Sequence, residues 1–73
     1  MKEEIKQNGS VLLSGDDGVS VPMIFRNLCG RNFSGDEYRN YLATVSHEFG
    51  VSAGRIELYR DGTAVETATI PEF

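Results

Sequence analysis

Cysteine and histidine are nearly absent from this 73-residue sequence, which has one of each. One cysteine cannot form a disulfide within the chain, and a lone thiol fits a reducing compartment, so the simplest expectation is a cytoplasmic location. One histidine leaves no second imidazole for a zinc site or a proton relay.

Long apolar segments are absent as well. The runs Val11–Leu13 and Met23–Phe25 are each three residues long, whereas a membrane-spanning helix needs roughly 20 apolar residues. Residues Met1–Glu4 lack the apolar stretch of a secretory signal. We therefore expect no membrane segment.

Basic charge is not in excess. Seven Lys and Arg stand against eleven Asp and Glu, for a net charge of −4. This balance disfavours general nucleic-acid binding, which requires a basic footprint. The charge is uneven, however, because residues 26–40 hold three arginines and only two acidic residues.

The sequence does contain enough apolar side chain for one core. Hydrophobic residues make up 40% of it, with four phenylalanines and three tyrosines. This content argues against disorder. A chain of this length corresponds to one domain, residues 1–73.

One segment carries helix start and stop signals. Ser34 and Glu37 have the spacing of a capping box, and Phe33 and Tyr38 have that of a hydrophobic staple. Gly50 can adopt the left-handed conformation that ends a helix. These signals predict one amphipathic helix, and its apolar residues recur at helical spacing: Tyr38, Tyr41, Leu42, Val45 and Phe49.

Turn signals near the start of the chain predict short strands. Asn8-Gly9 favours a type I′ turn and hence a hairpin over residues 3–14. Its first arm is weak, because Ile5 is the only clear apolar residue there, and a frayed terminus is the alternative.

The segment Val19–Arg26 alternates apolar and polar residues with a period of two, which predicts a half-buried strand. Pro22 has no N–H, so this strand would lie at an edge or carry a bulge. The polar turn Gly15–Gly18 precedes it.

A second hairpin is predicted over residues 55–70, around Asp61-Gly62. A two-residue turn would pair Leu58 with Val65 and would set Glu57 against Glu66. A three-residue turn with a bulge at Gly62 would avoid that repulsion by placing Glu66 opposite Ile56. The sequence leaves both registers open.

These elements predict an α+β fold of order β-β-β-α-β-β, with the first strand doubtful. An antiparallel sheet of four to five strands would pack one face on the single helix. We expect eleven residues in the core: Leu12, Val21, Phe25, Phe33, Tyr38, Leu42, Val45, Phe49, Ile56, Leu58 and Val65.

Within this order, Ser34–Gly62 runs from the helix through Gly50-Val51 and a short loop to an Ile-x-Leu strand. It resembles the passage from helix to strand in ubiquitin-like β-grasp domains, which implies a β-grasp-like arrangement. The chain ends in Ile70-Pro71-Glu72-Phe73, so it lacks the C-terminal Gly-Gly that conjugated members of that class use. A role as a conjugated modifier or sulfur carrier is therefore not supported.

Residues with reactive side chains have no partners at useful spacing. A nucleophilic Cys29 would need a base, and the only histidine, His47, is distant in sequence. Asp16 and Asp17 provide too few oxygens for calcium, which prefers six to eight. We predict no catalytic residue, no cofactor and no metal, and hence a protein that is not an enzyme.

The dipeptide Arg-Asn occurs three times within the net-positive stretch: Arg26-Asn27, Arg31-Asn32 and Arg39-Asn40. The arginine fork suits carboxylate and phosphate groups, and asparagine adds donors and acceptors. If they converge, these residues would form a docking patch. The alternative is ordinary solvated surface, with the arginines paired to acidic neighbours such as Asp36 and Glu37.

Tyr59 is the remaining candidate. It alternates with Leu58, so it lies on the outer side of the second hairpin if Leu58 is in the core. An exposed tyrosine beside charge is a common interface anchor. A tyrosine that only covers the sheet is the alternative.

These features favour a small non-enzymatic protein-binding module that docks on a larger protein as an adaptor or inhibitor. Anti-defence and host-modulating proteins of phages and plasmids are one class of this kind. A nucleic-acid-binding module that uses Arg26, Arg31 and Arg39 is an alternative, although the net charge disfavours it. A homo-oligomeric subunit paired through its sheet edges is another.

Overall fold

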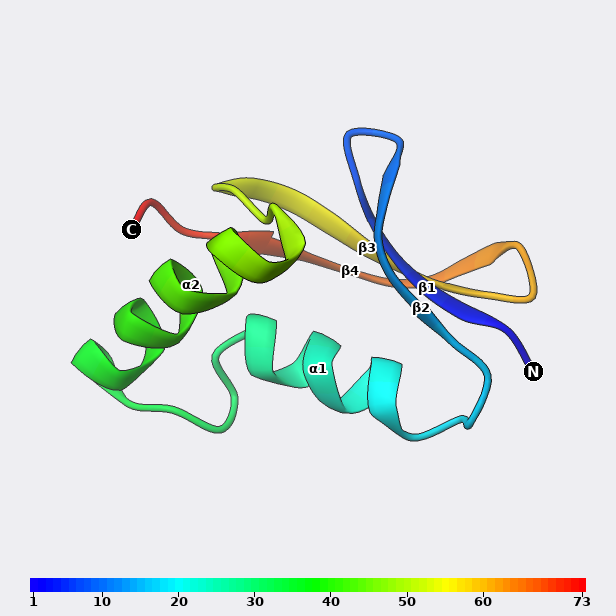
Figure 1. Cartoon of the computed structure of the whole chain (residues 1–73), viewed down its shortest axis with the longest axis horizontal. Coiled ribbons are helices and arrows are strands. Elements are labelled where there is room, and N and C mark those ends of the chain that lie inside the picture. Colours follow the sequence, from blue (N-terminus) through cyan, green and yellow to red (C-terminus); the bar gives the residue numbers. More distant parts are fainter.

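The computed structural model describes residues 1–73 as a four-stranded antiparallel sheet with two helices on one side (Figure 1). This is the α+β class that the sequence predicts, but with two helices instead of one. The elements in chain order are β1 (Glu3–Gln7), β2 (Ser10–Gly15), α1 (Ser20–Leu28), α2 (Gly35–Phe49), β3 (Gly54–Arg60) and β4 (Thr63–Ile70).

The first strand, which the sequence left doubtful, lies at the centre of the sheet. The strand order is β2-β1-β3-β4, and β1 pairs antiparallel with both β2 and β3. The predicted turn joins it to β2, with positive φ at Asn8 (53°) and Gly9 (79°). The inward residues of β1 are Glu3, Ile5 and Gln7, and all three are buried. The doubt arose because two of them, Glu3 and Gln7, are polar.

Gln7 connects β1 to the loop before β3. Its side-chain amide donates to the carbonyl of Ser52 at 2.8 Å, and its amide oxygen accepts from the Ser52 N–H at 2.9 Å. A buried amide is tolerated when its donors and acceptors are satisfied in this way. The contact therefore fixes the loop that follows α2 against the central strand.

The segment Val19–Arg26 is not the edge strand that we predicted, because all of it except Val19 lies in helix α1. Val21, Phe25 and Leu28 of α1 follow helical spacing, and each is only 1% exposed. Pro22 falls in the first turn, where its missing N–H costs no helical bond. The period-two alternation was misleading because Val21 and Phe25 fit both periods. The observed order is therefore β-β-α-α-β-β.

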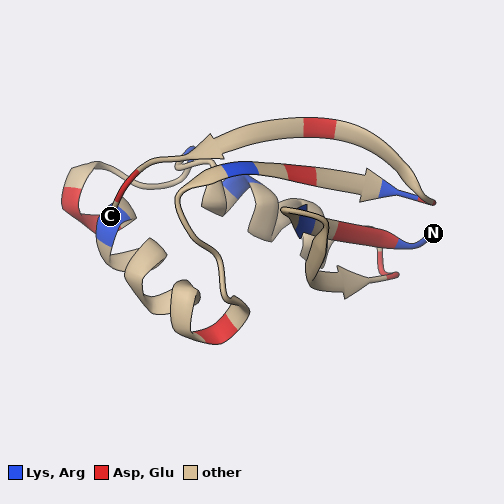
Figure 2. Cartoon of the chain, turned by 90° about the horizontal axis from the view of Figure 1, so that it is seen from above, with Lys and Arg blue, Asp and Glu red and all other residues tan.

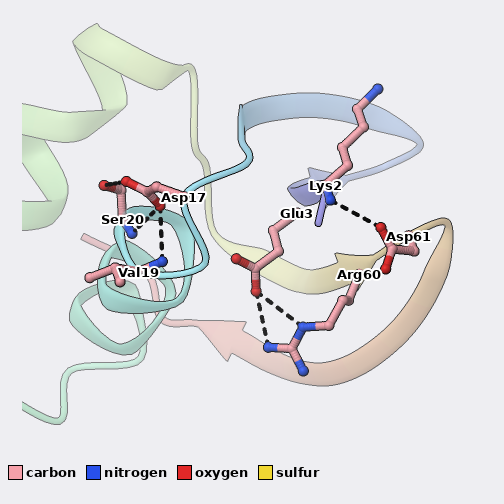
Figure 3. A network of polar contacts seen from close by, with 7 residues as sticks. All are labelled: Lys2, Glu3, Asp17, Val19, Ser20, Arg60 and Asp61. Atoms are coloured by element: carbon pink, nitrogen blue, oxygen red, sulfur yellow. Dashed lines mark hydrogen bonds and ion pairs between the residues drawn. The ribbon is translucent and has the colours of Figure 1, made fainter.

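Asp17 positions the start of α1 from within the predicted turn. One carboxylate oxygen accepts from the N–H of Val19 at 2.9 Å and from that of Ser20 at 2.8 Å, and the other accepts from the Ser20 hydroxyl (Figure 3). These bonds lower the pKa of Asp17 to about 2. The bond from the Ser20 hydroxyl contributes most, followed by the two N–H bonds. The bonds therefore favour the charged carboxylate.

The predicted helix is α2, and its end signals are mostly confirmed. Gly50 is left-handed at φ 76°, and the ring of Phe33 stacks 6.5 Å from that of Tyr38, as the staple predicts. The capping box differs, because the Ser34 hydroxyl donates to the Glu37 carboxylate at 3.0 Å and does not accept a hydrogen bond from a backbone N–H of the first turn. A second stacking contact joins Phe33 to Tyr41 at 4.7 Å.

The last hairpin follows neither of the two registers that the sequence left open. Its turn has two residues, because Arg60 faces Thr63, but the register then shifts between Leu58 and Tyr59. The extra residue on β4 is Val65, which is 44% exposed and not in the core as predicted.

This bulge also removes the expected charge repulsion. Glu66 lies opposite Leu58, and Glu57 faces Thr67. The two carboxylates therefore do not face each other across the strands, which would be unfavourable.

The core fills the space between the helices and the inner side of the sheet. Of the eleven predicted core residues, six are buried, Val65 is exposed, and four are half-buried: Leu12, Phe33, Tyr38 and Phe49. The buried residues that sequence reasoning missed are Ile5, Leu28, Val51 and Ile70. Neither helix has the length and apolar content that crossing a membrane requires.

The Asp17 contacts predict a specific acid sensitivity. A folded-state pKa of about 2, against an ordinary 3.8, gives stability that is present above about pH 4 and is lost as the pH falls towards 2. We expect Asp17→Asn to flatten the decline of the thermal midpoint over this range, as measured by circular dichroism. Asp16→Asn is the control, and an equally steep decline in Asp17→Asn would contradict the assigned role.

Candidate interaction surfaces

One face of the sheet is not covered by any helix. Both helices lie on the side where Ile5, Ile56 and Leu58 are buried, and the other side faces outward (Figures 1 and 2). Side chains alternate along a strand, so the residues between the buried ones point outward. We call this side the outer face, and its central residues are Glu4, Lys6, Arg55, Glu57 and Tyr59.

Tyr59 is half-buried on the outer face, as the sequence predicts. The ammonium group of Lys6, on the neighbouring strand β1, lies 4.3 Å from the centre of the Tyr59 ring. This is a cation–π contact, which combines an apolar ring and a positive charge in one spot.

The carboxylates of the outer face are already paired. Glu57 lies 3.5 Å from the guanidinium of Arg55, and Glu4 lies 3.9 Å from the ammonium of Lys2. Lys6 forms no ion pair within the chain, although its strand position faces Glu57. The outer face thus offers a free positive charge next to an aromatic ring, in a chain of net charge −4.

An ion pair between a buried carboxylate and an exposed arginine lies behind one end of this face. Glu3 of β1 is 1% exposed, and one of its oxygens accepts from Nε of Arg60 at 3.2 Å and from Nη2 at 3.0 Å (Figure 3). The other oxygen, Oε1, has no hydrogen-bond partner. This pair holds the last residue of β3, next to Tyr59, against β1.

The turn after β3 is fixed to the same place. The N–H of Asp61 donates to the carbonyl of Lys2 at 2.8 Å, and the N–H of Lys2 donates to the Asp61 carboxylate at 3.0 Å (Figure 3). Tyr59 is therefore attached to a strand whose end is anchored by both side-chain and backbone bonds.

The three predicted Arg-Asn pairs lie on three different parts of the fold: α1, the loop that follows it, and α2. The guanidinium of Arg31 lies 3.9 Å from Glu66 of β4, and that of Arg39 lies 4.0 Å from Asp36. Arg26 forms no ion pair. The pairing of Arg39 with Asp36 is the one that the solvated-surface alternative expected.

The asparagines of these pairs make local contacts. The side chain of Asn32 donates to that of Asn27 at 2.6 Å, which ties the loop to the end of α1. The backbone carbonyl of Asn40 accepts from the Thr44 hydroxyl at 3.0 Å. The backbone N–H of Arg31 also donates to the carbonyl of Arg26 at 3.3 Å. The first two Arg-Asn pairs are therefore bonded to each other, whereas no hydrogen bond or ion pair joins either of them to Arg39-Asn40.

Cys29 is half-buried against the core, next to the end of α1. Burial raises the pKa of its thiol, and the charge of Arg31 offsets only part of this effect. The thiol is therefore protonated at neutral pH, which does not favour a nucleophile. His47 is exposed near the end of α2.

The molecular surface has one open hollow, lined by Lys2, Ser14, Gly15 and Asp16. None of these residues is hydrophobic. No group of three or more His, Cys, Asp or Glu side chains is placed to hold a metal ion.

Sequence reasoning predicted the outward position of Tyr59 but did not identify Lys6 beside it. Lys6 faces outward because it follows Ile5, which points into the core from β1. The sequence left β1 doubtful, so the position of Lys6 was not inferred. The signal that was available is the alternation of Glu4 and Lys6 with Ile5, next to a strong turn dipeptide.

The ion pair of the buried Glu3 with Arg60 generates a stability prediction. Arg60→Ala leaves the buried carboxylate of Glu3 without its partner, and we expect a cost of about 1–3 kcal/mol in the free energy of unfolding, measured by urea denaturation. Arg55→Ala, on the same strand, removes only an exposed pair and should cost less than about 1 kcal/mol. Equal effects of the two changes would show that the Glu3–Arg60 pair is not important for stability.

Comparison with known families assigns nearly the whole chain. No curated protein and no solved structure matches the sequence. A family model described as "Domain of unknown function (DUF7688)" matches residues 2–71, which include every helix and strand. The chain therefore belongs to the DUF7688 family.

Proposed function

We propose that this protein is a non-enzymatic protein-binding module that docks on a larger protein through the outer face of its sheet. The observation that carries the proposal is the Tyr59 ring, held half-exposed on that face with the ammonium group of Lys6 above it. Tyrosine is enriched among the residues that dominate binding energies, especially near the centre of an interface.

The rigidity of the face supports this role. Tyr59 lies on β3, which is paired on both sides, and the Glu3–Arg60 pair anchors the end of that strand. A tyrosine on a rigid strand loses little conformational freedom on binding, since only two side-chain torsions are fixed. Little of the binding energy would then be lost to ordering the module itself.

The charges of the face indicate the chemistry of the partner. Lys6 has no carboxylate partner in the chain, whereas Glu4 and Glu57 are each paired with a cation. The best-matched partner is an acidic protein surface that places a carboxylate near Lys6 and an apolar group on the Tyr59 ring.

Roles as an adaptor or as an inhibitor both fit such a module, and a phage- or plasmid-type anti-defence or host-modulating protein is one form that we propose. We further propose a cytoplasmic location, because a single unpaired cysteine fits a reducing compartment. A second docking surface, formed by Arg26, Arg31 and Arg39, stays a prediction.

The test compares capture of a protein partner from host lysate, with nuclease present, by the native chain and by variants. Tyr59→Ala should weaken binding by roughly 30-fold or more, which corresponds to about 2 kcal/mol, as titrated with the purified partner. Lys6→Met should reduce both the affinity and its salt dependence. Tyr41→Ala, a tyrosine on α2, is the matched control and should bind as the native chain does.

A triple change of Arg26, Arg31 and Arg39 to Glu tests the competing surface. Binding that survives Tyr59→Ala but is lost in the triple variant would move the site to the arginines. Recovery of nucleic acid alone, lost at high salt, would contradict a protein-binding function.

A further inference from the structure

β4 is an edge strand with an open side. It pairs only with β3 and runs along the outside of the sheet (Figure 2). Six of its eight residues are exposed. Along such a strand, alternate residues direct their backbone N–H and C=O away from the sheet, where they can pair with another strand.

This edge has few of the features that prevent pairing with another chain. Thr63–Ile70 contains one charged residue, Glu66, and no proline. Its bulge lies near the turn, at Val65, and leaves the regular segment Glu66–Ile70. The opposite edge is better protected, because the bulge of β2 falls in the middle of that strand, at Leu12.

We propose that β4 pairs antiparallel with β4 of a second copy of this chain, with Ala68 on the two-fold axis. In this register Thr67 lies opposite Thr69 of the second copy, and Glu66 lies opposite Ile70 of the second copy. The two sheets then form one continuous sheet. The inference is independent of the proposed function, since it uses the edge of the sheet and not its outer face.

The hydrogen-bond pattern selects this register. The two-residue turn makes Arg60 and Thr63 a hydrogen-bonded pair. Hydrogen-bonded and non-hydrogen-bonded pairs alternate from there along the hairpin and continue beyond the bulge. In the regular segment, Thr67 and Thr69 fall in non-hydrogen-bonded pairs with β3, so their N–H and C=O point away from it. An axis at Ala68 sets Thr67 of each copy opposite Thr69 of the other, so all these outward groups are paired. An axis at Thr67 would instead set Thr69 against the bulged Val65.

Side-chain size and charge agree with the same register. Residues on such an axis form a non-hydrogen-bonded pair with their Cα atoms about 4.5 Å apart, and Ala68 is small enough for this approach. The two Glu66 carboxylates lie at opposite ends of the paired segment. Each keeps its own Arg31, at 3.9 Å. No like charges therefore face each other across the axis.

The contact is small. Five residues of each copy bury less than the roughly 1,200 Å² of a stable complex, so we expect a weak, reversible dimer. The two-fold axis lies perpendicular to the sheet and leaves both outer faces on the same side.

Cysteine cross-linking tests the register. A disulfide requires Cα atoms within about 4.4–6.8 Å, so Ala68→Cys in a Cys29→Ser background should form a covalent dimer on mild oxidation with copper phenanthroline. Thr67→Cys in the same background is the control, because its two copies lie further apart in this register. Cross-linking of Thr67→Cys without Ala68→Cys would overturn the proposed axis.

Sedimentation velocity between about 10 µM and 1 mM tests the association itself. The native chain should shift from monomer to dimer over this range. Thr67→Lys/Thr69→Lys should abolish the shift, whereas Thr63→Lys/Ala64→Lys, with the same charge added to β4 outside the paired segment, should retain it. A native chain that stays monomeric at 1 mM, or equal effects of the two double variants, would overturn the proposal.

Discussion

The placement of β1 at the centre of the sheet is the constraint on which the other elements depend. This strand buries a carboxylate and an amide on either side of Ile5, and burying polar groups is unfavourable unless they are bonded. Arg60 bonds to Glu3, and the backbone of Ser52 bonds to Gln7. Two distant parts of the chain, the last residue of β3 and the loop that precedes β3, are thereby tied to the first strand.

The same constraint determines which surfaces remain open. Because β1 and β3 are the central strands, their inward residues contribute the sheet's side of the core beneath α1 and α2. Their outward residues form the face that no helix covers. The strands at the two edges are then β2 and β4. The two interaction surfaces that we propose, the outer face around Tyr59 and the edge of β4, both follow from this arrangement.

Local signals in the sequence were sufficient for several elements. The dipeptides Asn8-Gly9 and Asp61-Gly62 form turns where we predicted them, with positive φ, because few other residues adopt that conformation readily. Only the length of the second turn was left open by the sequence. The ends of α2 and the outward position of Tyr59 were also predicted correctly. Each of these depends on residues that are close together in the chain.

Other features depend on contacts between distant residues. Glu3 and Gln7 made the first arm of the predicted hairpin look weak, with a frayed terminus as the alternative, because their partners Arg60 and Ser52 are far away in sequence. The helical period of α1 was hidden by a short alternation. The bulge at Val65 results from pairing along the whole of β4 and has no local signal. The convergence of Arg26, Arg31 and Arg39 could not be judged without the fold, which distributes them over α1, a loop and α2.

Native-state hydrogen exchange, followed by NMR, tests the central position of β1 most directly. Amide protons exchange slowly when their opening requires the core to unfold, and quickly at a frayed terminus. The account predicts that the amides of Glu4–Lys6 exchange as slowly as those of Ile56–Leu58 on β3. If the β1 amides exchanged at the rate of a free terminus while β3 stayed protected, the first strand would not hold the fold together.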